Sequence, residues 1–386
     1  MVDVDPRIDA AHAMPMAELV DRLQIAGLVR TSGELVGPCP SCGGKDRFGI
    51  NLQKQIFNCR VCGAKGDQIA LVQLALGMDF PAALEWLIGP RQELTPAQLA
   101  EQRRRAQENQ RKRDAEAAKH RADAIALAWK IWQRGQPADD TLVVDYLARR
   151  GIPPRSGAKL PRCFRFEPDA RLVVPDPNRS REFKTVHEGP AMLAEIAGPD
   201  GKFCGVHRTW IDLDQAKGKP VVPHPFKDGE IVSAKKVYGS KKGGAIRLYT
   251  PRDASILVMA EGIETTLSGL AAKAIETGAA YWAGVDLGNM SGQRKLGKGL
   301  KYAGIPDMSD HDAFIPPQWV QRLIFVQDGD SEPRLTRAKL LSGLRRAMAT
   351  RPGLTAGIVH PGDGIDMNDL LLSGGTTTSE EVNRDA

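Results

Sequence analysis

Two Cys-x2-Cys pairs constrain the first part of this 386-residue chain more than any other feature. Sixteen residues separate the pairs, which consist of Cys39, Cys42, Cys59 and Cys62. Each pair can turn two sulfurs toward one ion, and four thiolates fill the tetrahedral shell that Zn²⁺ prefers. Because no position is then left open for water, we predict a structural zinc site with one ion per chain. The alternatives are a redox pair, although such motifs do not come as matched pairs on a ribbon, or a chance grouping of reduced cysteines.

Basic and aromatic residues surround these cysteines. The basic ones are Lys45, Arg47, Lys54, Arg60 and Lys65. Phe48 and Phe57 lie on the two short strands predicted between the pairs, where they could stack on bases while the cations contact phosphate. Alternatively, both rings simply cover the zinc site. The sequence leaves both interpretations open, and it favours a zinc ribbon with single-stranded DNA as its partner.

Charge and hydropathy set broad limits on the chain. The formal net charge is +6 and the pI is about 9.0, which suits a nucleic-acid partner but is also common among soluble proteins. No run of about 18 apolar residues predicts a membrane span, and the acidic N-terminus lacks the apolar stretch of a signal peptide. We therefore expect a cytoplasmic protein with no membrane partner, in which thiols stay reduced. Cys163 and Cys204 are predicted to be small buried hydrophobes.

The pattern of the chain predicts an α/β protein in several parts. Apolar strands alternate with helices from residue 253 onward, which is typical of a parallel sheet covered on both faces. Short β-like runs separated by Gly, Pro and Asp precede it and predict an α+β subdomain. The predicted parts are a zinc-ribbon DNA-binding domain (1–90), a basic helical linker (91–135), the α+β subdomain (136–252), a catalytic parallel-sheet domain (253–375) and a disordered tail (376–386).

Acidic residues follow three of the predicted parallel strands. Glu261 ends SILVMAEG, Asp328 and Asp330 end RLIFVQDGD, and Asp366 follows LTAGIVHP. The carboxyl ends of parallel strands meet at one edge of a sheet, so these carboxylates should converge there. Clustered carboxylates repel each other unless a cation neutralises them, and oxygen ligands suit Mg²⁺ or Mn²⁺. A DxD after a strand is modest support alone, since acids often cap βα loops, but three acids in register favour a magnesium site.

One stretch imitates a phosphate-binding loop. Gly292, Gly297 and Lys298 have P-loop spacing, but Gly299 stands where the Mg²⁺-binding Ser or Thr would be, and no apolar strand precedes the stretch. We therefore predict a basic loop and no ATPase motor. Residues 286–321 as a whole form an insert to which the sequence assigns no role.

These motifs together resemble a known family. A four-cysteine zinc ribbon followed by a Toprim domain, which has a Rossmann-like parallel sheet, is similar to the DnaG-type bacterial primases and their phage and plasmid relatives. AEGIETTLS resembles the Toprim glutamate motif, VQDGD the DxD motif and GIDMNDLL the third acidic motif. The stretch PAMLAEIAGPDGKFCGVHRTWID, with the later SAKK and GGAIRL, resembles the subdomain that precedes Toprim in phage- and plasmid-borne members.

The resemblance implies a DNA primase, a nucleotidyltransferase that makes short RNA primers on single-stranded DNA from ribonucleoside triphosphates with Mg²⁺ or Mn²⁺. Glu261 would then act in acid/base work or metal positioning, and Asp328 and Asp330 would bind metal. Asp366 matches the last acidic motif, with Asp369 as a second candidate. Template or triphosphate would be held by basic residues, of which the resemblance suggests Lys235, Lys236, Arg208 and Arg247. The lysines could equally be solvated loop residues.

Other functions stay open on this sequence. A Toprim phosphodiesterase, such as a nuclease or topoisomerase, is one alternative, although the tyrosine-bearing DNA gate of a topoisomerase is not recognisable. A non-catalytic zinc-ribbon accessory protein that binds single-stranded DNA is another, against which the full acidic set argues. No helicase domain is recognisable after the Toprim-like segment, so we expect recruitment to a separate replicative helicase or independent action. The resemblance places the chain in a bacterial cell, encoded by the host or by a phage, plasmid or other mobile element.

Overall fold

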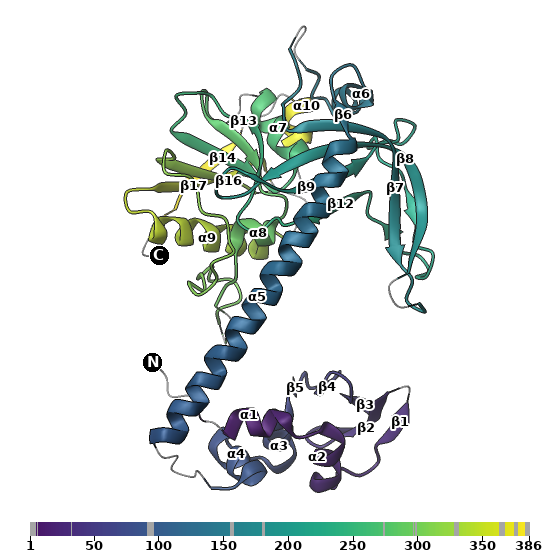
Figure 1. The fold of residues 1–386 in the computed structure, drawn as a ribbon, viewed down its shortest axis with the longest axis vertical. Coiled ribbons are helices and arrows are strands. Elements are labelled where there is room, and N and C mark those ends of the chain that lie inside the picture. Colours follow the sequence, from purple (N-terminus) through teal and green to yellow (C-terminus); the bar gives the residue numbers. More distant parts are fainter. Residues whose placement is uncertain are drawn as a thin grey trace. The chain divides into compact units, whose positions relative to one another are not determined.

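The computed structural model of the chain forms two compact units, residues 1–110 and 111–386, which are described separately below (Figure 1). It describes residues 5, 7–31, 33–90, 96–154, 158–179, 182–272, 275–295, 297, 299–327, 332–362, 367–373 and 377–382. Within these ranges, the side chains at 96–99, 102, 369, 372 and 373 are not described.

The first unit is a five-stranded antiparallel sheet with four short helices. The sheet has the order β1-β2-β3-β4-β5. Its strands are β1 (Val29–Thr31), β2 (Glu34–Cys39), β3 (Gly43–Asn51), β4 (Ile56–Cys59) and β5 (Lys65–Gly66). The helices are α1 (Arg7–Ala13), α2 (Met16–Leu23), α3 (Gln68–Leu76) and α4 (Phe80–Ile88). Because β2 and β4 each end on a cysteine, the strand pairing brings the two Cys-x2-Cys turns to one end of the ribbon.

One apolar core holds the helices against this ribbon. Phe48 and Phe57 are both buried in it, with ring centroids 5.5 Å apart. They therefore pack inside the unit, and the interpretation that they stack on bases is wrong. Helices α3 and α4 begin where Asp67 and Asp79 accept backbone hydrogen bonds as N-caps. Among the described helices, none alone is long and apolar enough to cross a membrane; α3 and α4 pass that test only as a pair, and the chain bends by 109° between them.

A single helix, α5 (Pro96–Arg134), runs through the predicted linker and belongs to both units. Its composition of Ala, Arg, Lys, Glu and Gln favours helix, and its middle turns are exposed along their length. Its last turns are anchored by apolar contacts: Ala128, Ile131 and Trp132 are buried against a sheet of the second unit. This matches the sequence, in which apolar side chains become frequent only near the end of the segment.

An antiparallel sheet begins the second unit. Its order is β12-β9-β8-β7-β6, with the short helix α6 (Leu142–Arg149) on one face and α5 on the other. The strands are β6 (Gln136–Pro137), β7 (Phe164–Pro175), β8 (Phe183–Ala197), β9 (Phe203–Trp210) and β12 (Lys235–Gly239). A two-stranded hairpin follows β9 and consists of β10 (Val222–Pro223) and β11 (Ile231–Val232). Both lone cysteines were predicted to be small buried hydrophobes. Cys163 is buried, which confirms the prediction, whereas Cys204 is half-buried and confirms it in part.

A six-stranded sheet completes the second unit, in the order β13-β15-β14-β16-β17-β18. The four central strands are parallel, and the two outer ones run antiparallel to them. The strands are β13 (Ile246–Tyr249), β14 (Ile256–Ala260), β15 (Ala280–Ala283), β16 (Arg322–Val326), β17 (Thr355–His360) and β18 (Thr378–Glu381). The helices are α7 (Ile263–Ala272), α8 (Leu287–Ser291), α9 (Pro333–Thr350) and α10 (Met367–Ser373).

Helices cover both faces of this sheet, as the continuous apolar strands predict. Leu257 and Met259 of β14 point to the face covered by α8 and α9, whereas Val258 and Ala260 point to the face covered by α7 and α10. The opposite placement of α7 and α9 is visible in Figure 1. A mixed α/β protein with a cysteine-rich ribbon is therefore confirmed.

The structure adds to the sequence analysis in two segments near this sheet, the predicted disordered tail and the insert 286–321. Residues 378–381 form β18 along β17, and Val382 is buried, so this part of the predicted disordered tail is ordered because pairing satisfies the exposed edge of β17. The insert after α8 is held by the buried Arg346 of α9, which donates to the carbonyls of Gln293, Asp307 and Asp310. Helix α8, not a strand, precedes the P-loop-like stretch, in line with its interpretation as a loop.

Candidate metal centres and the carboxyl edge of the parallel sheet

The four cysteines of the ribbon meet at one point. The Sγ atoms of Cys39 and Cys62 are 3.9 Å apart, those of Cys42 and Cys59 are 3.6 Å apart, and all four lie within 4.8 Å of one another. A tetrahedral ion with Zn–S bonds of about 2.3 Å would hold sulfurs roughly 3.8 Å apart, so the donor set fits zinc. Backbone hydrogen bonds from Cys62 and Val61 lower the pKa of Cys59 to about 6. For Cys62 the backbone N–H of Ala64 lowers the pKa, but the Cys59 sulfur, desolvation and the other two sulfurs outweigh it and raise the pKa to about 11. Such crowding of sulfurs is what a bound cation would relieve.

Glycine is required beside the first cysteine pair. Gly44 has φ of +90°, and a Cβ there would lie 2.0 Å from Nε of Arg47, whose side chain folds over the turn. Four of the five predicted cations stay exposed around the ribbon, namely Lys45, Lys54, Arg60 and Lys65. The first unit therefore combines a closed metal site with an exposed basic surface.

The parallel sheet has its topological switch at β14 and β16. These strands are neighbours, yet the helix after β14, α7, covers one face while the helix after β16, α9, covers the other. Such a reversal opens a crevice at the carboxyl ends of the two strands, where ligands of open α/β sheets bind. Glu261 directly follows β14, and the pairing of Met259 with Phe325 puts it in register with Gln327, the residue before Asp328.

Of the predicted acidic residues, Glu261 is the one whose side chain is described. Burial raises its pKa, and the nearby carboxylate of Asp286 raises it further, against the backbone N–H of Leu287 and the charges of Lys339 and Lys235. Mutual repulsion of this kind is what a bound divalent cation would relieve, so the donor chemistry fits Mg²⁺ or Mn²⁺. Asp328, Asp330 and Asp366 lie outside the described residues; Asp369 is on α10, but its side chain is not described.

Asp286 is a second carboxylate close to Glu261, which the sequence analysis did not single out. It caps α8 by accepting the N–H of Asn289 at 2.8 Å, and it pairs with Lys241. The residue before it, Val285, has φ of +73°, a conformation that β-branched residues rarely adopt. Strain of this kind is often found at functional sites. The signal was available, because AAYWAGVD is an apolar strand that ends in an acid, like the strand before Glu261.

The two lysines predicted to bind template or triphosphate point to opposite faces of β12. Nζ of Lys235 lies 2.9 Å from Oε2 of Glu264, on the face that α7 covers. Lys236 instead donates to the carbonyl of Val173, and burial lowers the pKa of its amino group. Strand alternation therefore brings Lys235 alone toward the parallel sheet.

The two predicted arginines are engaged within the protein. Arg208 is 3% exposed, donates to Glu167 at 2.5 Å and lies between the rings of Trp210 and Tyr238. Arg247 stacks on Trp282 and donates to the carbonyl of Gly198 at 3.2 Å, and burial lowers the pKa of its guanidinium. Arg208 is not placed to contact a phosphate from solvent, so we assign it a structural role.

A buried polar cluster lies one turn of α7 beyond Glu261. Glu264 is 5% exposed and accepts a hydrogen bond of 2.5 Å from the hydroxyl of Tyr146. Lys235 contacts its other oxygen, and Nζ of Lys219 lies 3.6 Å from the first. Burial alone would raise the pKa of Glu264, but the two lysines outweigh it and lower the pKa. None of these partnerships was predicted, apart from Lys235 as a candidate.

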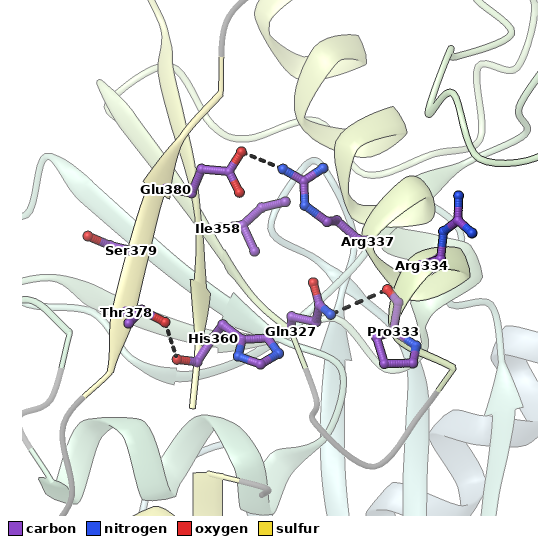
Figure 2. A pocket seen from close by; sticks show the side chains of 9 residues that line it. All are labelled: Gln327, Pro333, Arg334, Arg337, Ile358, His360, Thr378, Ser379 and Glu380. Carbon is purple, nitrogen blue, oxygen red and sulfur yellow. Dashed lines mark hydrogen bonds and ion pairs between the residues drawn. The ribbon is translucent and has the colours of Figure 1, made fainter. Parts of the chain in front are cut away.

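A cavity of about 390 Å³ opens beside the carboxyl ends of β16 and β17 (Figure 2). Gln327 and His360 line it from the strand ends, and Arg334 and Arg337 line it from the first turns of α9. Glu380 of β18 pairs with Arg337 across the opening. The cavity adds a basic wall to the edge of the sheet where the predicted acidic motifs occur in sequence.

The ribbon geometry and its cysteine site define the first unit as a zinc ribbon. Two family profiles match the chain: residues 8–102 match the CHC2 zinc finger family of DnaG (Zn_ribbon_DnaG), and residues 122–248 match a domain of unknown function (DUF7146). The N-terminal segment is therefore a zinc ribbon of the DnaG primase type, and the resemblance to that family holds there. A search of the curated proteins found no match.

Solved primases are among the structures that the chain resembles distantly. The zinc-binding and RNA polymerase domains of the Aquifex aeolicus primase share 14% identity, with a TM-score of 0.35, 96% of this chain covered and 83% of that one. A DNA primase domain from Pseudomonas aeruginosa shares 14%, with a TM-score of 0.37 and coverages of 65% and 74%. The primase fragment of the bacteriophage T7 primase-helicase shares 11%, with a TM-score of 0.27 and coverages of 88% and 94%.

Proposed function

We propose that this protein is a DNA primase that makes short RNA primers on single-stranded DNA from ribonucleoside triphosphates. One observation carries the proposal: a DnaG-type zinc ribbon precedes, in the same chain, a parallel sheet whose switch-point strands lead directly into Glu261 and Asp328-x-Asp330. We assign residues 253–375 to a Toprim catalytic domain, which the strand order and the acidic motifs support.

The proposed reaction is attack of a primer 3′-hydroxyl on the α-phosphate of a nucleotide, with pyrophosphate as the leaving group. Glu261, Asp328, Asp330, Asp366 and Asp369 would hold Mg²⁺ or Mn²⁺. When bound, such ions stabilise the charge that develops on the phosphate in phosphoryl transfer. The raised pKa of Glu261 suits a carboxyl group that holds a proton when no metal is bound and gives it up to bind a cation.

The zinc ribbon would handle the template. Its exposed cations, Lys45, Lys54, Arg60 and Lys65, offer phosphate contacts, while its phenylalanines serve the core. Affinity for DNA should therefore come mainly from charge and depend strongly on salt. A separate replicative helicase would be a further partner.

Primer synthesis tests the proposal directly. Purified full-length protein, a single-stranded template, ribonucleotides and Mg²⁺ should yield short RNA products, which the combined variant Asp328→Ala, Asp330→Ala should abolish without weakening template binding. As a matched control, Asp307→Ala, in the insert, should leave synthesis unchanged. Cleavage of the DNA by the wild type instead of RNA synthesis would favour a Toprim phosphodiesterase, and template binding with neither reaction would favour an accessory role.

A further inference from the structure

The insert that follows α8 folds into a short hairpin, which we call the basic finger (residues 294–306, of which 296 and 298 lie outside the described residues). A β-bridge between Arg294 and Pro306 closes it, and the N–H of Lys295 donates to the carbonyl of Ile305 at 2.9 Å. The stretch with P-loop-like spacing overlaps its first arm. This segment is therefore ordered by strand-like pairing, and the proposed function leaves it without a role.

Helix α9 holds the finger through two arginines. Arg345 donates to the carbonyls of Ala303 and Gly304 at 2.6 and 3.2 Å, and Arg346 donates to carbonyls of the flanking residues, as described above. Gly304 is buried with φ of +64°, and a Cβ there would lie 2.7 Å from Cβ of Leu341. The finger is thus fixed against α9, on the side of the parallel sheet opposite to α7.

The finger carries positive charge that no described carboxylate neutralises. Its sequence contains no acid, and its described cations are Arg294, Lys295 and Lys301. Lys295 and Lys301 are exposed, and Arg294 donates to the carbonyl of Lys301 at 2.8 Å. In the described part of the chain no carboxylate lies within ion-pairing distance of any of the three, because the nearest acids in sequence pair elsewhere.

The acids that follow the finger have partners of their own. Asp307 accepts the N–H and the hydroxyl of Ser309. Asp310 accepts two backbone N–H groups, and Asp312 pairs with two cations outside the finger. Hydrogen bonds from Ser309 lower the pKa of Asp307 most, and Lys295 adds to this effect only through space. The charge of the finger therefore stays available to a ligand.

One aromatic ring joins the finger to the first turn of α9. Tyr302 is 39% exposed, and its ring centroid lies 5.0 Å from Nζ of Lys301 and 4.8 Å from the guanidinium carbon of Arg334. Arg334 lines the cavity at the carboxyl ends of β16 and β17, and it points away from Glu380, which Arg337 contacts (Figure 2). A cation of the finger and a cation of α9 are therefore held on the same ring.

We propose that the basic finger binds the sugar–phosphate backbone of a nucleic acid strand through Lys295, Lys301 and Arg334, with Tyr302 positioning the last two. Separate cations interleaved with an aromatic ring are typical of surfaces that follow a strand. The finger lies on the α9 side of the parallel sheet, whereas Lys235 faces α7 on the other side, so this surface is distinct from the contacts that the family resemblance suggests. The identity of the strand as template or product rests on the proposed function, but the binding itself does not.

Equilibrium binding tests the finger without catalysis. Labelled oligothymidine and an RNA–DNA hybrid of the same length are titrated separately with full-length protein, without nucleotides or divalent metal, over a series of salt concentrations. The variant Lys295→Gln, Lys301→Gln should bind at least one of them about fivefold more weakly at about 0.1 M salt, with a salt slope smaller by about one, because lost phosphate contacts release fewer counterions. The control Lys159→Gln, Lys202→Gln removes two exposed lysines outside the finger and should change neither affinity more than about twofold.

The two nucleic acids identify the strand. A loss confined to oligothymidine identifies the unpaired template, and a loss for the hybrid identifies the product duplex. Unchanged affinity for both overturns the proposal and would leave an acidic protein surface as the partner of the finger. These outcomes do not depend on primer synthesis: if the finger binds nucleic acid in a protein that makes no primers, the proposed function alone fails.

Lysine acetylation, located by mass spectrometry, tests the contact in the wild-type protein. Bound nucleic acid should slow the modification of Lys295 and Lys301 relative to that of Lys159 and Lys202, and equal protection of the two pairs contradicts the assignment. The role of Tyr302 is tested by its ring: Tyr302→Phe should keep the affinity, whereas Tyr302→Leu should weaken it about two- to fivefold, because the cations lose the surface that holds them. If Tyr302→Leu binds as tightly as the wild type, the ring does not position these cations.

Discussion

Replacing Arg208 by methionine distinguishes a structural role from the phosphate contact that the family resemblance suggested. The guanidinium is 3% exposed and donates to Glu167 at 2.5 Å, between two aromatic rings. Removing one partner of a buried ion pair costs about 3–5 kcal/mol, because the other charge is left in a poor environment. Arg134 still contacts Glu167 at 3.1 Å from the solvent side, so we expect the lower end, about 3 kcal/mol.

Thermal unfolding of the full chain measures this cost. For a unit of this size about 3 kcal/mol corresponds to a fall in Tm of roughly 6–12 °C. The control Arg171→Met removes an arginine of β7 whose ion pair with Glu188 is exposed, and it should cost less than about 1 kcal/mol. In the double variant with Glu167→Gln the loss should be smaller than in Arg208→Met alone. If Arg208→Met instead unfolds like the control and binds DNA more weakly, the structural assignment is refuted.

Three further predictions concern the ribbon and the pH dependence of stability. Elemental analysis should find one zinc per wild-type chain and none in the variant Cys39→Ala, Cys59→Ala, and stoichiometric zinc in that variant would contradict the assignment. Gly44→Ala should cost about 1–2 kcal/mol, since it forces a positive φ and a clash with Arg47, and Arg47→Ala should recover part of the loss in a thermal melt. His207 has a pKa near 4 when folded against an ordinary 6.5, so the unfolded chain takes up a proton first and stability falls as pH drops through this window, by up to about 3 kcal/mol. In His207→Gln the free energy of unfolding should depend less on pH in this window. If denaturant titrations show the same pH dependence in wild type and variant, the imidazole is not buried as described.

Local sequence signals predicted the zinc site and the type of the main elements well. The Cys-x2-Cys spacing depends on short-range turns, and the helix at Pro96–Arg134 follows from residue propensity over many turns. The parallel strands were recognisable because burial on both faces makes them continuously apolar, as in Ile256–Ala260. In each case the information lies in one continuous stretch of the chain and does not depend on contacts with distant segments.

The burial and the contacts of individual charged residues could not be predicted in the same way. Arg208 is buried because Glu167, 41 residues away, and two rings enclose it. Lys235 and Lys236 differ because strand alternation sends one toward Glu264 and the other toward the far face. Such outcomes depend on pairing between distant segments, for which one sequence holds no local signal. The order of residues 378–381 likewise depends on the free edge of β17.

Dinucleotide formation is the measurement that tests the central claim most directly. Full-length wild-type protein is incubated with single-stranded DNA, two ribonucleoside triphosphates and Mg²⁺, and the products are identified by mass. The account predicts a template-dependent dinucleotide with release of pyrophosphate, which is lost in Glu261→Gln and in the combined Asp328→Ala, Asp330→Ala variant. A dinucleotide that persists in those variants, or a wild type that makes none while its zinc ribbon is intact and binds DNA, would contradict it.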